Sequence, residues 1–194
     1  MRVTITEKDA LLVIDVQVDF LPGGALAVAG GDKVIAPLND YSQRFFAAGA
    51  PVYYTRDWHP HNHLSFRDNG GIWPAHCLAD RPGASFPPSL TLPSDNKFII
   101  SKGVMREFDA YSGFQGTPLR SLLQERGIRR CFVGGLATEY CVKSTVEGAL
   151  NLGYATFLLI DAIQGIELNS GDMEQAIRQM LFGGAVAVSL ADLD

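Results

Sequence analysis

The sequence predicts a doubly wound α/β domain, a mostly parallel sheet of about six strands with helices on both faces. Two observations predict this fold class. Short apolar runs rich in β-branched residues alternate along the chain with helix-length segments in which apolar residues recur every 3.6 positions. Glycine follows each of these helical segments, at positions 49, 127, 153 and 183, where helix C-caps are expected.

The expected elements follow one another in a regular order. The apolar run 11–16 is the first strand, the periodic segment 32–48 is a helix ending at Gly49, and the apolar run 51–55 is the second strand. By the same two criteria the chain continues with strand 98–101, helix 118–126, strand 130–134, helix 139–152, strand 155–160, helix 170–182 and strand 185–189.

One interval departs from this alternation. Residues 58–97 hold six of the ten prolines, both tryptophans and all four histidines, with little helical or strand periodicity. A long irregular stretch inside a compact domain is usually functional. We therefore expect residues 58–97 to form an insertion or lid over one end of the sheet.

Size and charge limit the class of protein. With 194 residues, of which 47% are hydrophobic, the chain is expected to form one domain spanning 1–194. A net charge of −5 disfavours nucleic acid and anionic membranes as partners, so a small-molecule ligand is expected. Phosphate-binding glycine motifs are absent, which disfavours nucleotide cofactors. The oligomeric state stays open, with a homo-oligomer among the alternatives.

The N-terminal residues and the cysteines indicate a cytoplasmic protein. Charged residues at positions 2, 7, 8 and 9 precede any apolar run, which is not the pattern of a signal peptide. Three cysteines without Cys-x-x-Cys spacing indicate neither a disulfide framework nor a zinc finger.

The histidines indicate a metal site. His59, His61, His63 and His76 lie within eighteen residues, and Asp57 stands two positions before the first of them. Imidazole and carboxylate together suit zinc, iron or manganese. The alternative is a polar loop that is merely rich in histidine.

Reactive side chains follow the predicted strands. In an open α/β sheet, ligands bind beyond the carboxyl ends of the strands, and Asp15, Asp57 and Lys102 end the first three. After the fourth, a glycine-containing turn leads to Thr138, which is expected to cap a helix with Cys141 in its first turn.

Cys141 is the candidate nucleophile at this edge. The helix N-terminus and a nearby lysine are expected to favour its thiolate, with Asp15 as general base and turn N–H groups as an oxyanion hole. The alternative is an inert buried cysteine, which suits Cys131 inside its strand. Cys77, next to His76, stays open between the two.

Six segments match, in order, the motifs of one known family. They are 13–20, 55–60, 63–66, 73–77, 101–103 and 134–142. On these residues the chain resembles the isochorismatase-like cysteine hydrolases, and within them the metal-containing nicotinamidase (pyrazinamidase) branch. The Asp-x-His motif at 57–59 and Trp-Pro-x-His-Cys at 73–77 separate that branch from metal-free relatives.

The resemblance implies roles for the residues at the strand ends. Asp15, Lys102 and Cys141 match the catalytic triad. Asp57, His59 and His76 match the protein ligands of one divalent metal ion, and water is implied to complete the site. Zinc is the expected ion, with iron and manganese as the alternatives.

The resemblance also implies how substrate is bound. The Leu136–Ala137 peptide is implied to be cis, with the N–H groups of Ala137 and Cys141 forming the oxyanion hole. Phe20 and Trp73 match residues that hold a pyridine ring, and Tyr111 matches one that lines the pocket. For these three aromatic residues, ordinary core packing is the alternative.

Some positions depart from the family pattern. Val18 stands where asparagine is common, and the segment 105–110 differs in length and charge from that of some relatives. His63 is a ligand in some members at a longer spacing, so we expect it behind the ligands, and His61 on the surface.

The implied reaction is hydrolysis of nicotinamide to nicotinate and ammonia through a Cys141 thioester, a step of NAD salvage, with pyrazinamide also a substrate. Two rivals stay open: a related amidohydrolase of another small amide or ureido compound, and a silent module that only binds metal or ligand.

Overall fold

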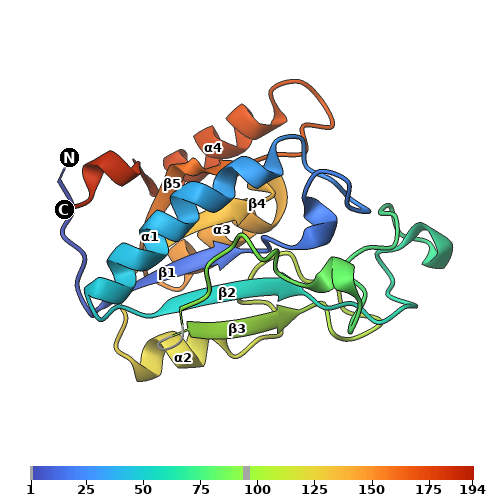
Figure 1. Cartoon of the computed structure of the whole chain (residues 1–194), viewed down its shortest axis with the longest axis horizontal. Helices are drawn as coiled ribbons and strands as arrows, with labels where there is room; N and C mark the ends of the chain where they lie inside the picture. Colours follow the sequence, from blue (N-terminus) through green and yellow to red (C-terminus); the bar gives the residue numbers. More distant parts are fainter. Residues whose placement is uncertain (1, 94–96) are drawn as a thin grey trace.

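Six parallel strands form one sheet at the centre of the computed structural model, which describes residues 2–93 and 97–194 (Figure 1). Their order is β3-β2-β1-β4-β5-β6. The strands are β1 (Asp9–Ile14), β2 (Val52–Asp57), β3 (Lys97–Lys102), β4 (Arg130–Leu136), β5 (Ala155–Gln164) and β6 (Val186–Val188). The chain therefore winds outward in both directions from the β1/β4 pair, which confirms the predicted doubly wound fold.

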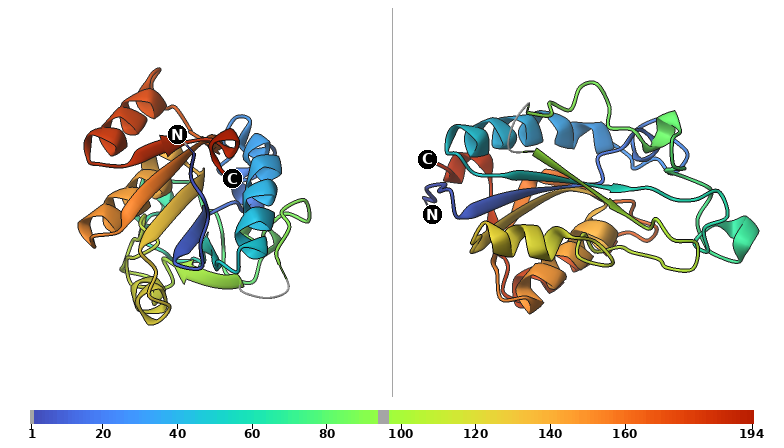
Figure 2. Two further views of the ribbon diagram at one scale, coloured as in Figure 1. Left: turned by 90° about the vertical axis from the view of Figure 1, so that its left-hand side faces the viewer. Right: turned by 90° about the horizontal axis from the view of Figure 1, so that it is seen from below.

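The helices cover both faces of the sheet (Figure 2). They are α1 (Ile35–Ala47) on one face, and α2 (Leu119–Glu125), α3 (Lys143–Asn151) and α4 (Asp172–Phe182) on the other. Alternate residues of β1 supply the two cores: Leu11 and Val13 belong to the apolar cluster of α1, and Leu12 and Ile14 to that of the other helices. None of the helices in the described ranges combines the length and apolarity that a membrane span requires.

The segment between β2 and β3 is largely irregular, as expected. Within 58–93 the only helical elements are two 3-10 turns, Arg67–Asn69 and Pro82–Ala84. Two isolated bridges, His59 with Leu78 and Phe66 with Trp73, fold this segment back on itself beyond the carboxyl end of the sheet (Figure 1). Residues 94–96 of the predicted insertion 58–97 lie outside the described residues.

The first strand ends earlier than predicted. It spans Asp9–Ile14 instead of 11–16, because Asp15 adopts a left-handed conformation with φ 48° and breaks the extended backbone. The predicted helix 139–152 is also divided, into a π-helical turn over Thr138–Val142 and α3. The predicted helix 32–48 begins as a 3-10 turn over Gly31–Val34 before α1.

Two strands of the second half also differ from their predicted lengths. β5 extends to Gln164 instead of ending at residue 160, past an irregularity in its pairing with β4 between Val133 and Gly135. β6 is three residues long instead of the five of 185–189. The remaining helix and strand boundaries agree to within one or two residues.

Candidate active site

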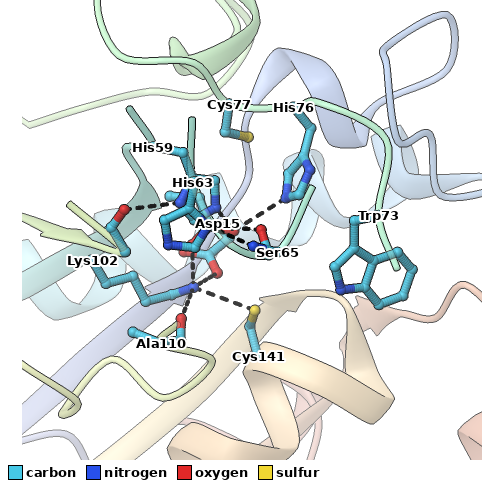
Figure 3. Close-up of polar contacts among 12 residues, drawn as sticks. Asp15, His59, His63, Ser65, Trp73, His76, Cys77, Lys102, Ala110 and Cys141 are labelled. Atoms are coloured by element: carbon cyan, nitrogen blue, oxygen red, sulfur yellow. Dashed lines mark hydrogen bonds and ion pairs between the residues drawn. The ribbon is translucent and has the colours of Figure 1, made fainter. Parts of the chain in front are cut away.

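Four side chains from four neighbouring strand ends meet at the carboxyl edge of the sheet (Figure 3). Asp15 follows β1, Asp57 ends β2, Lys102 ends β3, and Cys141 lies in the turn after β4. All four are buried. The topology therefore brings the predicted triad residues together with the first residue of the predicted metal site.

The Lys102 ammonium group is the centre of this cluster. Its Nζ donates to Asp57 Oδ1 at 2.5 Å, to the Ala110 carbonyl oxygen at 3.0 Å and to Cys141 Sγ at 3.4 Å. It also lies 2.9 Å from Asp15 Oδ2. Burial lowers the pKa of Lys102, but the carboxylates of Asp15 and Asp57 outweigh that effect and hold the pKa well above its ordinary value. The side chain is therefore a fixed positive charge.

The two carboxylate oxygens of Asp15 have different partners. Its Oδ1 accepts a hydrogen bond from the Thr55 hydroxyl at 2.6 Å. Its Oδ2 is buried and forms an ion pair with Lys102 Nζ at 2.9 Å. Burial raises the pKa of Asp15, and the charge of Lys102 only partly opposes this. Asp15 is therefore a stronger base than an exposed aspartate, and its Oδ2 lies on the side of Lys102.

The pKa of the Cys141 thiol is shifted in the direction opposite to the prediction. Burial raises its pKa well above the ordinary value, Lys102 opposes that rise, and the Asp15 and Asp57 carboxylates add to it. The predicted depression of the Cys141 pKa is therefore wrong. Desolvation of the buried thiol outweighs the attraction to a single lysine.

The turn that carries Cys141 also differs from the predicted one. Ala137 is the residue before the π-helical turn, and its carbonyl accepts from the N–H groups of Tyr140 and Val142 at 3.1 and 3.2 Å. The prediction of a Thr138 cap is wrong, because the Thr138 hydroxyl is buried without a hydrogen-bond partner among the described residues. The Leu136–Ala137 peptide is cis, as the resemblance implied.

Gly135 allows β4 to approach β1 just before this turn. Its φ is 126°, and a Cβ atom there would lie 2.1 Å from the Ile14 carbonyl oxygen. A side chain would therefore force the two strands apart at the point where Asp15 and the Cys141 turn leave the sheet.

A second cluster, next to the triad, has the composition of a metal site. Asp57, His59 and His76 present ligand atoms that all lie within 4.8 Å of one another, and all three residues are buried. His59 Nδ1 donates to the Gly103 carbonyl at 2.9 Å, and His76 Nδ1 donates to the Pro74 carbonyl at 2.8 Å. Each ring therefore turns Nε2 towards Asp57 Oδ2, at 3.6 and 4.0 Å. Two imidazoles and one carboxylate, fixed from behind by carbonyls, fit zinc.

The charges of this cluster depend on Asp57. Burial raises the pKa of Asp57, but Lys102 and His59 outweigh it and hold that pKa well below its ordinary value. Burial lowers the pKa of both histidines. Asp57 overcomes this effect at His59, whose pKa is raised, but not at His76, whose pKa is lowered. Asp57 is therefore a permanent carboxylate between Lys102 and the two imidazoles.

The other two histidines lie outside the cluster of ligand atoms. His63 is buried and stacks on His59 with ring centroids 4.1 Å apart. Its ring nitrogens face the Ser65 hydroxyl at 2.8 Å and the Phe108 carbonyl at 3.2 Å. His61 is exposed. Both positions are those expected from the sequence.

The predicted aromatic residues border the two clusters. Phe20 lies against His76, with ring centroids 5.6 Å apart. Trp73 Nε1 donates to the Tyr111 hydroxyl at 2.9 Å, which joins the β2–β3 segment to the β3–α2 segment. Sequence reasoning missed Tyr140, which packs against Trp73 at 5.1 Å and Tyr111 at 6.0 Å. The sequence feature that could have identified Tyr140 is its position next to Cys141.

Gln17 is a second residue without a predicted role. Its buried side-chain amide donates to the carbonyls of Asp57 at 2.8 Å and Ala84 at 2.9 Å, and accepts from the Asp57 N–H at 2.7 Å. Because the chain leaves β1 at Asp15, the backbone of residue 17 does not pair with β2. The Gln17 side chain makes these hydrogen bonds to the end of β2 instead. Its only sequence signal was its place in the segment 13–20.

The remaining cysteines are buried thiols. Cys131 lies inside β4, and burial raises its pKa, as predicted for a core residue. Cys77, left open by the sequence, has a raised pKa for the same reason, and its N–H donates to Asp19 Oδ2 at 2.7 Å.

Comparison with known proteins places this geometry in a family. The isochorismatase domain model matches residues 9–192. A nicotinamidase from Acinetobacter baylyi is 36% identical, over 97% of this chain and 96% of its own. A nicotinamidase/pyrazinamidase from Mycobacterium tuberculosis is 38% identical, over 83% of this chain and 89% of its own.

Solved structures agree with the sequence matches. The Pyrococcus horikoshii pyrazinamidase, in complex with zinc, has a TM-score of 0.90 at 45% identity, over 94% of this chain and 99% of its own. The PnC1 protein of L. infantum, in complex with nicotinate, has a TM-score of 0.92 at 33% identity, over 100% and 99%. Together with the domain match, these similarities establish that the chain belongs to the isochorismatase family.

Proposed function

We propose that the chain is a metal-containing nicotinamidase, which hydrolyses nicotinamide to nicotinate and ammonia and also accepts pyrazinamide. The observation that carries the proposal is the position of Lys102. Its ammonium group contacts Asp15 and Cys141 on one side and Asp57 of the metal cluster on the other. The names of the relatives supply the substrate class.

Proton transfer in the proposed mechanism begins at Asp15. Its Oδ2, which shares Lys102 as a neighbour with the Cys141 sulfur, takes the proton of the thiol as the sulfur attacks the amide carbon. Lys102 stabilises the negative charge on sulfur. The carbon–nitrogen bond then breaks, and Asp15 returns the proton to the departing nitrogen, which leaves as ammonia. The acyl group stays on the Cys141 sulfur as a thioester.

Water completes the reaction. Asp15 takes a proton from a water molecule, whose oxygen attacks the thioester carbon. The carbon–sulfur bond then breaks, Asp15 returns that proton to the sulfur to restore the Cys141 thiol, and the acid formed loses its own proton to give nicotinate. In both halves the carbonyl oxygen of the acyl group bears negative charge as the carbon is attacked, and the N–H groups of Ala137 and Cys141 are the proposed donors to it.

The substrate ring is proposed to lie between the aromatic residues, with Phe20 and Trp73 on its faces and Tyr111 lining the pocket. Asp57, His59 and His76 would hold one divalent ion, for which zinc is the first candidate. When bound, that ion supplies a Lewis acid for the ring nitrogen and for water.

The proposal predicts ammonia release from both amides by protein whose metal content has been measured. Cys141→Ala should reduce kcat by at least roughly 10³-fold, because the thiol forms the covalent bond. The same variant should keep its fold and bound metal, because the Asp57 cluster is intact.

Three outcomes would overturn the assignment. Ammonia release by Cys141→Ala at the wild-type rate would remove Cys141 from the reaction. A wild-type protein that hydrolyses other small amides or ureido compounds but neither pyridine nor pyrazine amides would be the related amidohydrolase. A protein that releases no ammonia from any of these would be the binding module.

A further inference from the structure

One buried aromatic ring contacts all three buried histidines of the site. Phe66, in the β2–β3 segment, is 1% exposed. Its ring centroid lies 5.6 Å from that of His59, 5.7 Å from His63 and 5.5 Å from His76, with interplanar angles of 88°, 61° and 67°. The phenyl ring therefore stands steeply inclined to each imidazole.

The backbone of Phe66 is equally constrained. Its N–H donates to the His63 carbonyl at 3.2 Å, and its own carbonyl accepts from Gly71 at 2.9 Å. On either side of it, the Trp73 N–H donates to the Ser65 carbonyl at 3.0 Å and the Arg67 N–H to the Trp73 carbonyl at 2.8 Å. Phe66 is thus fixed on a short paired segment that also carries Trp73.

Hydrogen bonds alone do not fix the tilt of the two ligand imidazoles. His59 and His76 are each held through Nδ1 by a single carbonyl, so either ring can still tilt about that bond. At His59, one boundary is Gly103, where a Cβ atom would lie 2.4 Å from the ring. His63 also stacks on His59, and Phe20 lies against His76. Phe66 differs from these neighbours because its ring contacts both ligands at once.

We infer that Phe66 is a positioning residue of the metal site, an inference that rests on the metal site of the proposed function. Its ring sets the tilt of His59 and His76 so that both Nε2 atoms face Asp57. The apolar ring also keeps water from replacing an imidazole at the ion, because the hydrophobic shell of a metal site controls solvent access. Loss of the flat ring should therefore speed metal release.

The test compares two equivalent substitutions in zinc-loaded protein. Phe66→Leu removes the ring at the site, and Phe45→Leu removes an equally buried ring in α1 that packs on Phe132 at 5.1 Å. Zinc transfer to a colorimetric chelator should be roughly 10–100-fold faster for Phe66→Leu and unchanged for Phe45→Leu. The visible spectrum of the cobalt-substituted protein should change for Phe66→Leu alone.

The comparison separates positioning from general destabilisation. Wild-type zinc release and an unchanged cobalt spectrum in Phe66→Leu would overturn the inference, as would an equal acceleration in Phe45→Leu. If Phe66→Leu does not fold, Phe66→Met has a similar volume but an unbranched side chain that adapts to the cavity without supplying a flat ring, and it should give the same result. Since metal release is measured without substrate, failure of the proposed nicotinamidase activity is a separate outcome.

Discussion

At the scale of single residues, the Asp15 carboxylate has two opposing effects on Cys141. It is the proposed base that removes the thiol proton, yet its negative charge raises the pKa of that thiol. Asp15→Asn removes both effects. We predict that Cys141 in this variant ionises at lower pH and is alkylated faster by iodoacetamide at a given pH, although ammonia release is lost.

This prediction is measured by following alkylation of the Cys141 peptide by mass spectrometry from about pH 6 to about pH 10. Cys131 is the internal control, because it is buried in β4 away from Asp15 and its rate should not change. A Cys141 that titrates at the same or higher pH in Asp15→Asn would show that Asp15 does not control the thiol.

At the scale of elements, the Gln17 side chain joins the end of β2 to the irregular segment before β3. Gln17→Leu leaves the Asp57 N–H, the Asp57 carbonyl and the Ala84 carbonyl without these partners. We predict that kcat/KM falls roughly 10–100-fold, because residues that orient a ligand carboxylate affect metal sites to about that extent. The free energy of unfolding should also fall by about 1–3 kcal/mol.

Ser42→Ala is the matched control for this element. It removes a buried hydrogen bond, 3.0 Å to the Tyr54 hydroxyl, from the interface of α1 with β2. Denaturant unfolding and steady-state kinetics on both variants should give a stability loss in each and a kinetic defect in Gln17→Leu only. Wild-type kinetics in a folded Gln17→Leu protein would contradict a positioning role for Gln17.

The sequence predicted those elements whose cause is local. Apolar runs and terminal glycines located the strands and helices, because a buried strand and a capped helix each leave a pattern in neighbouring residues. The left-handed Asp15 and the π-helical turn at Thr138–Val142 depend on contacts between strands distant in sequence. No local pattern could therefore have located them.

The same distinction holds within the site. Asp57 and the four histidines indicated a metal site because they share one sequence segment and a ligand chemistry, and the resemblance to the family selected Asp57, His59 and His76 among them. The sign of the Cys141 pKa shift could not, since it depends on burial that only the folded chain creates. Phe66 and Gln17 act through contacts with other functional residues, so their own residue types gave no indication.

At the scale of the whole molecule, the two ends of the sheet carry different groups of charged residues. The carboxyl end holds the buried charges of the site. The other end holds Asp9, at the start of β1, whose carboxylate accepts from Arg130 Nε at 2.5 Å and from the Thr6 N–H at 2.6 Å. Six-residue strands separate these ends by about 20 Å. Stability and catalysis should therefore respond to different substitutions.

Asp9→Asn tests this separation. The amide cannot replace the charge-assisted pair with the half-buried Arg130, so we predict that the free energy of unfolding falls by about 1.5–3 kcal/mol. The melting temperature should fall by roughly 2–4 °C per kcal/mol for a chain of this size. Arg2→Ala, which breaks an exposed pair with Asp194, should change it little, because solvent screens that pair. Both variants should keep wild-type kcat/KM and zinc release below their melting temperatures. A folded Asp9→Asn protein with altered kcat/KM or zinc release would show that the two ends of the sheet are coupled.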